Sequence, residues 1–422
     1  MKASKWAIIK SFFAVKDYQD REQLQQHQQR ALQHRLATHN SQFYPHSSDL
    51  AAYPIINKKI FMANFADINR YQLSEHDALS VALQAEQSRD FSPVIDTPYG
   101  SVSVGLSSGT SGSRGIFLVS KDESALWAGY MLRRMLPRPY LARHSVAFFL
   151  RANSNLYDSV KSILLRFEFY DLFSGLNAHI QRLNQQQPSI LIAPAQVLQQ
   201  LAQHPDVHIQ PQKIISVAEV LEPQVKAEIE HRFGVMVHQI YQCTEGFLAH
   251  TCEHGNLHLN EDMLYLEKDW IDQASGRFSP IITDFHRSSQ PIIRYRLDDV
   301  LILDERPCPC GSAFTRLAGI EGRCDDILIG KSLHDDKDVP IYADFIRRAI
   351  IACDDVQEYY VAQQGNRLDI QLLPDSIENQ QAVDMALNQL WQSLDIQPLQ
   401  HHFQAYQSQA LHQKRRRVVH LS

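Results

Sequence analysis

A loop rich in serine and glycine, residues 106–115 (LSSGTSGSRG), stands between two apolar runs at 101–106 and 116–119 that alternate like strands. Glycines let backbone N–H groups turn toward a ligand, and the hydroxyls add uncharged donors. This composition is typical of a loop that holds phosphate. A flexible linker can have the same composition, but linkers usually join domains, whereas this loop lies between two expected strands.

Three further polar clusters follow expected strands, at 241–245 (YQCTE), 283–284 (TD) and 294–299 (RYRLDD). An aromatic ring can stack on a base, and a carboxylate at a strand end can accept both ribose hydroxyls. A Thr-Glu pair can hold Mg²⁺ against phosphate oxygens. The clusters therefore indicate a nucleotide site. The serine/glycine loop is not a kinase-type P-loop, because no Gly-Lys-Ser/Thr follows its glycines and the next segment is expected to be a strand.

The elements that must position these clusters form a clear order along the chain. A polar helix is expected over 18–37, and a Ser120/Glu123 capping box predicts a helix ending before Pro137. Residues 190–241 read as β-α-β-α-β, which predicts a parallel sheet. Hairpin-like β structure is expected from 257 to 303, and a small α+β unit follows.

We therefore predict an α/β protein with a large N-terminal domain, 1–324, and a small, mobile α+β C-terminal domain, 325–422. The large domain is expected to combine parallel α/β sheets with a β-rich subdomain. A chain of 422 residues can hold two or three domains.

The charge pattern limits the classes of partner. The net charge is −6, and the basic residues form a run only at 414–417 (KRRR), so no nucleic-acid partner is expected. Residues 1–16 mix lysines with large apolar residues, but Lys10 interrupts the apolar run and no small-residue cleavage site follows. We expect a cytoplasmic protein without integral membrane association, and weak docking of this segment on a membrane surface stays open.

In their order, the serine/glycine loop, Tyr-x-x-Thr-Glu, Arg-Tyr-Arg-x-x-Asp and 322–326 (GRCDD) resemble the adenylate-forming superfamily of acyl-CoA ligases, adenylation domains and luciferases. Within it the chain is most similar to the phenylacetate-CoA ligase branch, which includes deazaflavin-adenylating and indoleacetate–lysine ligases. The segments 54–58 (PIINK) and 151–157 (RANSNLY) fit that branch.

The resemblance implies ATP- and Mg²⁺-dependent adenylation of a carboxylic acid, expected to be aromatic, with release of pyrophosphate. Transfer of the acyl group to CoA would follow. Two alternatives stay open: an amide ligase that uses an amine or a carrier protein as acceptor, and a nucleotide-binding pseudoenzyme.

The resemblance also assigns the nucleotide contacts. Tyr241 would lie against adenine and Asp299 would take the ribose hydroxyls, while Arg323 would add a second ribose or phosphate contact. Thr244 would contact phosphate and Glu245 would hold Mg²⁺. The β- and γ-phosphates would be held by the loop residues Ser107, Ser108, Gly109, Thr110, Ser111, Gly112 and Arg114. The loop lysine usual in the superfamily is absent, and Arg114 is a candidate substitute.

Two residues are assigned to the C-terminal domain, which rotates between the half-reactions in the superfamily. Asp325 would be the hinge, and Lys414 would be the catalytic lysine that neutralises charge at the reacting groups. The alternative for Lys414 is a solvated basic tail at a chain end.

Six cysteines in 422 residues do not suggest a disulfide scaffold. Cys308-Pro-Cys310-Gly can present two thiolates to one metal, and Cys252, His254 and His258 offer further ligands. Because some relatives of the branch have a similar grouping, we predict that Cys252, His258, Cys308 and Cys310 bind a structural zinc. The alternative is a set of reduced surface cysteines.

Overall fold

The structure, a computed structural model, describes residues 4–88, 90, 93–107, 115–140, 142–150, 165–353, 355–410 and 413–421, and of Asp325 the backbone alone. Its first helices are α1 (Lys5–Ala14), α2 (Arg21–Thr38), α3 (Lys58–Ala63), α4 (Phe65–Ile68) and α5 (Glu75–Ser88). A small antiparallel sheet follows, made of β1 (Ile95–Thr97), β2 (Gly100–Leu106) and β3 (Ile116–Ser120). Strands β2 and β3 confirm the two strands expected on either side of the serine/glycine loop.

Helix α6 (Lys121–Met135) begins at the predicted capping box. The Ser120 side chain accepts a hydrogen bond from the Glu123 N–H, and the Glu123 carboxylate accepts one from the Ser120 N–H. Helix α1 packs against α6 at Gly129, where an added Cβ would lie 2.5 Å from the carbonyl oxygen of Ile8. The absence of a side chain at Gly129 therefore lets the two helices approach closely.

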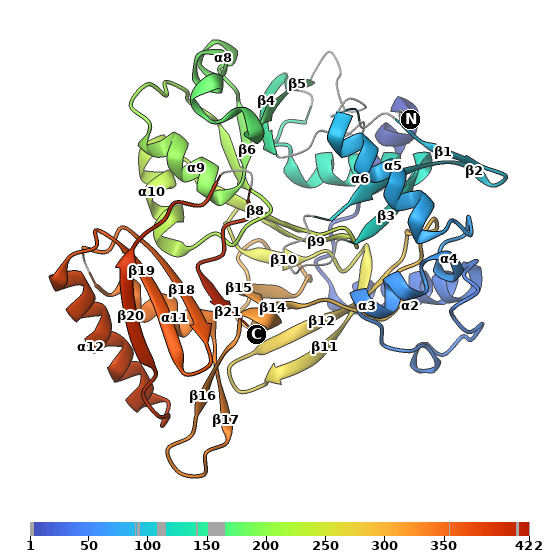
Figure 1. Ribbon diagram of the computed structural model, residues 1–422. Helices are drawn as coiled ribbons and strands as arrows, with labels where there is room; N and C mark the ends of the chain where they lie inside the picture. Colours follow the sequence, from blue (N-terminus) through green and yellow to red (C-terminus); the bar gives the residue numbers. More distant parts are fainter. Residues whose placement is uncertain are drawn as a thin grey trace.

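A large mixed sheet forms the centre of the molecule, with the strand order β11-β12-β14-β15-β10-β9-β8-β7-β6-β4-β5 and β13 paired to β12 (Figure 1). Its parallel half consists of β4 (His144–Leu150), β5 (Leu165–Asp171), β6 (Ile190–Ala193), β7 (Lys213–Ser216) and β8 (Val237–Gln242). Helices α9 (Ala195–Gln203) and α10 (Pro223–Phe233) connect β6, β7 and β8, which confirms the predicted β-α-β-α-β region.

The two faces of these parallel strands pack against different helices. Ala147 and Phe149 of β4 belong to a core cluster with α8 (Ile180–Gln186), α9 and α10. The alternate residues Val146 and Phe148 belong to a second cluster that includes Met131 of α6. This division follows from the two-residue period of a strand, which sends successive side chains to opposite faces.

The other half of the sheet is antiparallel, as expected for this part of the sequence. It contains β9 (Phe247–Thr251), β10 (Leu257–Leu259), β11 (Leu264–Asp272), β12 (Arg277–Asp284), β13 (Tyr295–Arg296), β14 (Asp299–Asp304) and β15 (Arg316–Arg323). Because β8 pairs antiparallel with β9, the carboxyl end of β8 turns directly into this half. That turn carries the Thr244-Glu245 pair.

The C-terminal part has its own four-stranded sheet, in the order β20-β19-β18-β21. Its elements are β16 (Leu328–Lys331), β17 (Asp338–Ile341), α11 (Ala343–Ile351), β18 (Glu358–Gln364), β19 (Arg367–Leu373), α12 (Ile377–Ser393), β20 (Gln400–Ala405) and β21 (Val418–His420). One hydrophobic cluster, with buried residues from Leu328 to Val418, forms its core. The domain boundary near residue 325 stays a prediction.

Among the described residues, the structure has no helix that is both long and apolar enough to cross a membrane.

Candidate functional site

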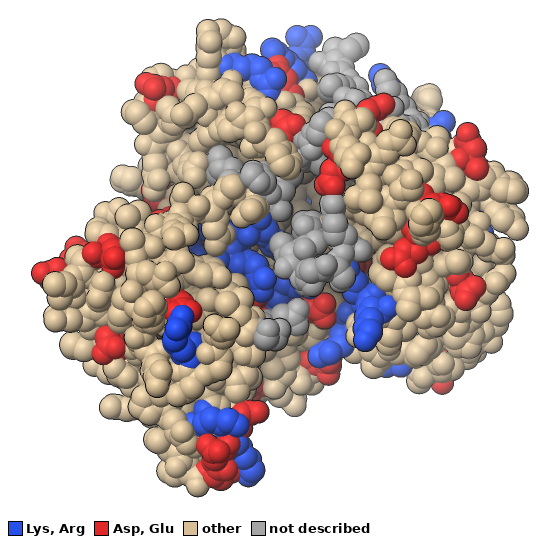
Figure 2. Space-filling view, in the orientation of Figure 1, with Lys and Arg blue, Asp and Glu red and all other residues tan. Residues whose placement is uncertain are grey.

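A cavity of about 560 Å³ lies between α6, one face of the parallel strands and the C-terminal tail. The residues predicted for the site that line it are Ser107, Thr244, Glu245, Asp299, Arg323 and Lys414. They come from segments more than 300 residues apart in the sequence. Figure 2 shows basic side chains gathered at the centre of one face, between the C-terminal and the larger part of the molecule.

The serine/glycine loop is described only at its base. The Ser107 N–H donates to the Gly115 carbonyl at 2.8 Å, and the Gly115 N–H donates to Ser107 Oγ at 2.7 Å. These two bonds close the loop between β2 and β3 at the edge of the cavity. The predicted phosphate contacts of Ser108, Gly109, Thr110, Ser111, Gly112 and Arg114 lie outside the described residues.

The turn between β8 and β9 places Thr244 and Glu245 in the cavity wall. The Cys243 N–H donates to the Gly246 carbonyl at 3.0 Å, which makes the turn tight. Thr244 Oγ1 donates to Glu245 Oε2 at 2.8 Å, so the hydroxyl orients the carboxylate. Burial and the neighbouring Glu245 carboxylate raise the pKa of the Tyr295 phenol, which stays a neutral donor beside the carboxylate.

Strand register brings the two expected ribose contacts together. Asp299 at the start of β14 lies opposite Arg323 at the end of β15. Tyr241 Oη donates to Asp299 Oδ2 at 2.5 Å. Burial raises the pKa of Asp299, while the charge of Lys414 and the bond from Tyr241 act in the opposite direction. The carboxylate is therefore partly desolvated, and Lys414 and Tyr241 stabilise its ionised form.

Tyr241, which was expected to lie against adenine, packs in the protein core. Its side chain is 7% exposed, belongs to the core cluster of the antiparallel half and is not among the residues that line the cavity. At the end of β8 the cavity wall is formed by Gln242 and Cys243 instead. Stacking of Tyr241 on adenine stays a prediction, whereas its bond to Asp299 gives it a positioning role in this structure.

The basic run at 414–417 is not a solvated tail. The Arg417 side chain is 8% exposed and pairs with Glu222 at 3.1 Å and with Glu358 at 2.9 Å. Arg416 pairs with Asp326, and the Arg415 N–H donates to Glu219 Oε1 at 3.2 Å. Because Glu219 and Glu222 belong to the larger part of the molecule, these contacts fix the tail across the gap between the two parts. Lys414 is thereby held in the cavity wall.

Lys58 lines the cavity although the sequence motifs did not single it out as a site residue, and it was expected only as part of the 54–58 segment that resembles the branch. Lys58 begins α3, lines the cavity and places Nζ 3.5 Å from Ser107 Oγ. Burial lowers the pKa of Lys58, and the charge of Glu245 partly offsets this effect. The structure therefore places a cation at the base of the loop that lacks the usual lysine.

Ala218 is a second residue that the sequence did not single out. It follows β7, lines the cavity and has a φ of 66°. A positive φ is uncommon for a residue with a Cβ and is found at sites where a backbone must approach a ligand. No residue type in this segment signals that conformation, so sequence reasoning had no basis for it.

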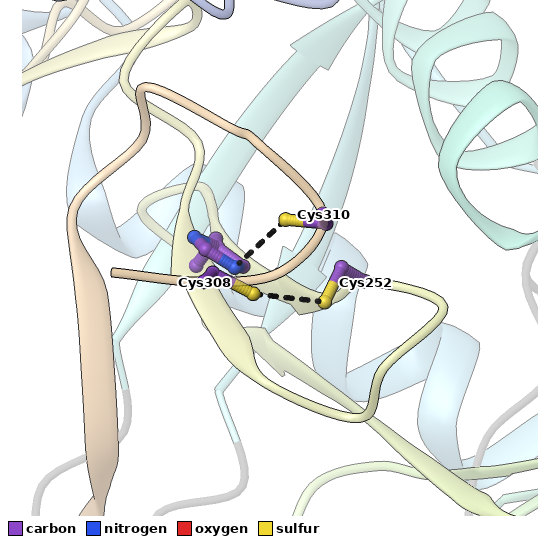
Figure 3. Close-up of side chains that lie close together, drawn as sticks. Cys252, Cys308 and Cys310 are labelled. Atoms are coloured by element: carbon purple, nitrogen blue, oxygen red, sulfur yellow. Dashed lines mark hydrogen bonds between the residues drawn. The ribbon is translucent and has the colours of Figure 1, made fainter. Parts of the chain in front are cut away.

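Four side chains of types that can ligate a metal meet at a second site, formed by the β9–β10 turn, β10 and the β14–β15 connection. The ligand atoms of Cys252, His258, Cys308 and Cys310 all lie within 4.8 Å of one another (Figure 3). Cys252 Sγ is 3.7 Å from Cys308 Sγ, and Cys310 Sγ is 3.5 Å from His258 Nε2. Around a tetrahedral zinc, two sulfurs lie about 3.8 Å apart and a sulfur and a nitrogen about 3.6 Å apart. The four side chains fit that ion.

The surroundings of this cluster orient its ligands. His258 Nδ1 lies 3.1 Å from the Phe314 carbonyl, which leaves Nε2 facing the sulfurs, and Asn256 Nδ2 donates to Cys308 Sγ at 3.2 Å. Hydrogen bonds of this kind, which orient the side chains around a metal, are typical of metal-binding histidines and thiolates. Burial raises the pKa of the Cys308 thiol, but hydrogen bonds from Cys310 and His258 outweigh it and lower the pKa to about 6. Cys308 therefore ionises readily, as a metal ligand must.

Comparison with known proteins gives the class of the fold. No protein-family model matches the chain. The structure is similar to 2-hydroxyisobutyryl-CoA ligase in complex with an acyl-AMP, with a TM-score of 0.63 and 16% identity over 94% of this chain and 89% of that one. It is also similar to an anthranilate CoA ligase in complex with anthranoyl-AMP, with a TM-score of 0.52 and 14% identity over 74% of this chain and 65% of that one. The fold is that of the adenylate-forming ligases, as the sequence predicted.

In sequence, the chain is similar to the phenylacetate-coenzyme A ligase of Thermus thermophilus. The two chains are 24% identical over 166 residues, which is 36% of this chain. The match spans about a third of that relative, 36% of its length. This partial match is to a member of the branch that the sequence motifs resemble.

Proposed function

We propose that this protein is an AMP-forming acid–thiol ligase that adenylates a carboxylic acid with ATP and then transfers the acyl group to CoA. The observation that carries the proposal is the meeting of Glu245, Asp299, Arg323 and Lys414 in one cavity with the base of the serine/glycine loop. CoA is proposed as acceptor because the matched relative and the two structural neighbours are CoA ligases.

Each of these side chains has a task in binding ATP. Asp299, held by Tyr241, accepts the ribose hydroxyls, and Arg323 opposite it adds a positive charge. Lys58 and Thr244 contact phosphate oxygens near the loop. The Glu245 carboxylate, oriented by Thr244, would hold Mg²⁺, an ion that binds through carboxylates and substrate phosphates. Bound Mg²⁺ would neutralise part of the phosphate charge.

The reaction has two steps. A carboxylate oxygen of the acid attacks the α-phosphorus, the bond to the oxygen that bridges to the β-phosphate breaks, and pyrophosphate leaves. In the second step the sulfur of CoA attacks the acyl carbon, its proton goes to solvent, and AMP leaves. Lys414 would reduce the repulsion between the carboxylate and the phosphate in the first step, because it brings a positive charge into the cavity.

Pyrophosphate release from ATP tests the proposal, measured over a panel of apolar, aryl and amino acids with and without CoA. Acid-dependent release that becomes thioester formation when CoA is added is the expected result. Release without thioester would favour an amine or carrier-protein acceptor. If no acid causes release while ATP still binds, the protein is a nucleotide-binding pseudoenzyme and the proposal fails.

We propose that the C-terminal part, from Asp325 as hinge, carries Lys414 into and out of the cavity. Replacing Lys414 by alanine should then reduce adenylation far more than thioester formation from supplied acyl-adenylate. A matched control is Lys331→Ala, which removes a lysine of the same part that pairs with Asp338 at the surface. Equal losses of both half-reactions in the Lys414 variant would contradict the assignment.

We propose a structural zinc ion at Cys252, His258, Cys308 and Cys310, supported by the spacing of their ligand atoms. The purified protein should hold about one equivalent of zinc, because the four side chains complete a tetrahedral site. Cys308→Ser should lose the metal, whereas Cys353→Ser, at a cysteine outside the cluster, should retain it. Metal content by mass spectrometry checks both. Equal zinc in the two variants, or none in the unmodified protein, would contradict the assignment.

A further inference from the structure

Much of the cavity is lined by apolar side chains, which come from two directions and belong largely to the second core cluster. From α6 come Trp127, Met131, Leu132, Met135 and the residue after it, Leu136. From the sheet come Val146, Phe148, Leu150, Leu165, Phe167, Ile190, Ile192 and Ile240. On β4, β5 and β6 these residues are spaced by two, so on each of these strands they lie on one face of the sheet. No charged side chain lies among these described residues.

The opposite face of the same strands has no such space. Phe149 and Leu191 are completely buried and pack with three helices in the first core cluster. Protein interiors are normally close-packed, with few voids larger than a water molecule. An apolar hollow on one face of an otherwise filled sheet is therefore a property that packing alone does not account for, and pockets of this size and lining typically bind apolar ligands.

The hollow is continuous with the polar end of the same cavity. Lys58 and Glu245 interact through their charges, as Lys414 and Asp299 do, whereas the cavity-lining Met135 and Phe167 pack together in the second core cluster. A ligand that spans both ends must carry a negatively charged group at one end and an apolar body at the other. A carboxylic acid with a hydrocarbon or aryl body matches this division.

From these observations we infer that the acid substrate is an extended apolar carboxylic acid whose body carries no polar substituent. The inference rests on the proposed ligase function, because the carboxylate is placed where adenylation would occur. A hydroxyl, amino or second carboxyl group on the body would be buried with no partner among the described apolar lining, and such burial is unfavourable. A short acid would leave much of the hollow unfilled.

Two series of acids test the inference, each measured both by pyrophosphate release and by calorimetric binding. In a straight-chain series from two to twelve carbons, kcat/KM should rise about fourfold per added methylene until the hollow is filled. A terminal hydroxyl on the same chain should lower kcat/KM roughly tenfold to hundredfold. A parallel series of ω-phenyl acids distinguishes an aliphatic from an aryl body. Binding should show a negative heat-capacity change.

A substitution at the apolar end provides the structural test. Met135→Trp adds volume in the hollow and should lower kcat/KM and affinity for the longest acids at least tenfold more than for the shortest. Met385→Trp is the matched control, because Met385 on α12 is 63% exposed and lies outside the cavity. That control should change either quantity less than about twofold.

The outcomes separate the inference from the proposed function. If apolar acids bind in a manner sensitive to Met135→Trp but release no pyrophosphate, the ligase proposal fails and the apolar site stands. If short or polar acids react and bind better than their apolar counterparts, the inference is wrong and the ligase proposal stands. If Met135→Trp affects long and short acids equally, the hollow is not the acid site.

Discussion

Replacing Tyr241 by phenylalanine removes one oxygen atom and keeps the ring, so it separates the two roles considered for this residue. A ring that only stacks on adenine would tolerate the change. The structure instead predicts a strong effect, because Tyr241 Oη donates to Asp299 at 2.5 Å and the carboxylate is partly desolvated. A hydrogen bond to a charged group contributes about 1.5–3 kcal/mol.

The effect should be seen in the pH dependence of KM for ATP. In the proposed site, Asp299 would accept the ribose hydroxyls only when it is ionised, and burial already raises its pKa. ATP binding should therefore weaken as the pH falls through that pKa. Without the bond from Tyr241 the carboxylate is less stable relative to the acid, and the pKa should rise further, by about 1 to 2. The pH at which KM begins to increase should move upward by the same amount, with a smaller change in kcat at saturating ATP.

The assay is pyrophosphate release at varied ATP from pH 5 to 9, with Tyr170→Phe as control. Tyr170 is fully buried and donates to Gln186 Oε1 at 2.6 Å, but it does not line the cavity. Both variants lose a buried hydroxyl, so both should lose stability, and only Tyr241→Phe should change the KM profile. An unchanged profile in Tyr241→Phe would refute the positioning role and leave stacking as the function of the ring.

Substitutions at three further positions test other parts of the structure. Glu245→Gln keeps the volume of the side chain but removes a ligand for Mg²⁺, so acid-dependent pyrophosphate release should fall at least a hundredfold at an unchanged melting temperature; retained turnover would refute the assignment. Lys58→Met should raise KM for ATP roughly tenfold, because it removes a charge near Ser107, and Lys58→Arg should restore part of the loss; equal activity of both variants would show that the charge is not needed. Phe149→Ala should lower the free energy of unfolding by about 3–5 kcal/mol, since Phe149 is fully buried; a loss below 1 kcal/mol in a denaturant titration would contradict the packing described for that face.

Much of the fold was predictable because its signals are local. The Ser120/Glu123 capping box and the regular alternation over 190–241 depend on neighbouring residues, and both are confirmed. Strand β21 was missed because Val418–His420 is too short to show an alternating pattern, although valine favours strands, and its pairing with β18 is not local. The β16–β17 hairpin was missed for a similar reason, since Pro340 and several charged residues weaken its alternation.

The candidate site was also predictable only in part. Residues within motifs, such as Glu245 and Asp299, were predicted by their place in a recognisable order and do line one cavity. Lys58 was missed as a site residue because its contact with Ser107 joins positions 49 residues apart and follows no spacing rule. The hydrogen bond from Tyr241 to Asp299 depends on strand register, which cannot be predicted from the sequence motifs alone. The apolar hollow was invisible as well, since Phe148 and Phe149 look alike in sequence although one faces a cavity and the other a filled core.

The alternation of Phe148 and Phe149 along β4 also separates two kinds of mutational effect. A change at Phe149 alters a close-packed core and mainly lowers stability. A change at Phe148 alters the wall of the cavity. Residues of the first kind hold the sheet together while residues of the second kind remain open to substitution. A scaffold built in this way can acquire preference for a new ligand by substitutions at every second position of a strand without first losing its fold.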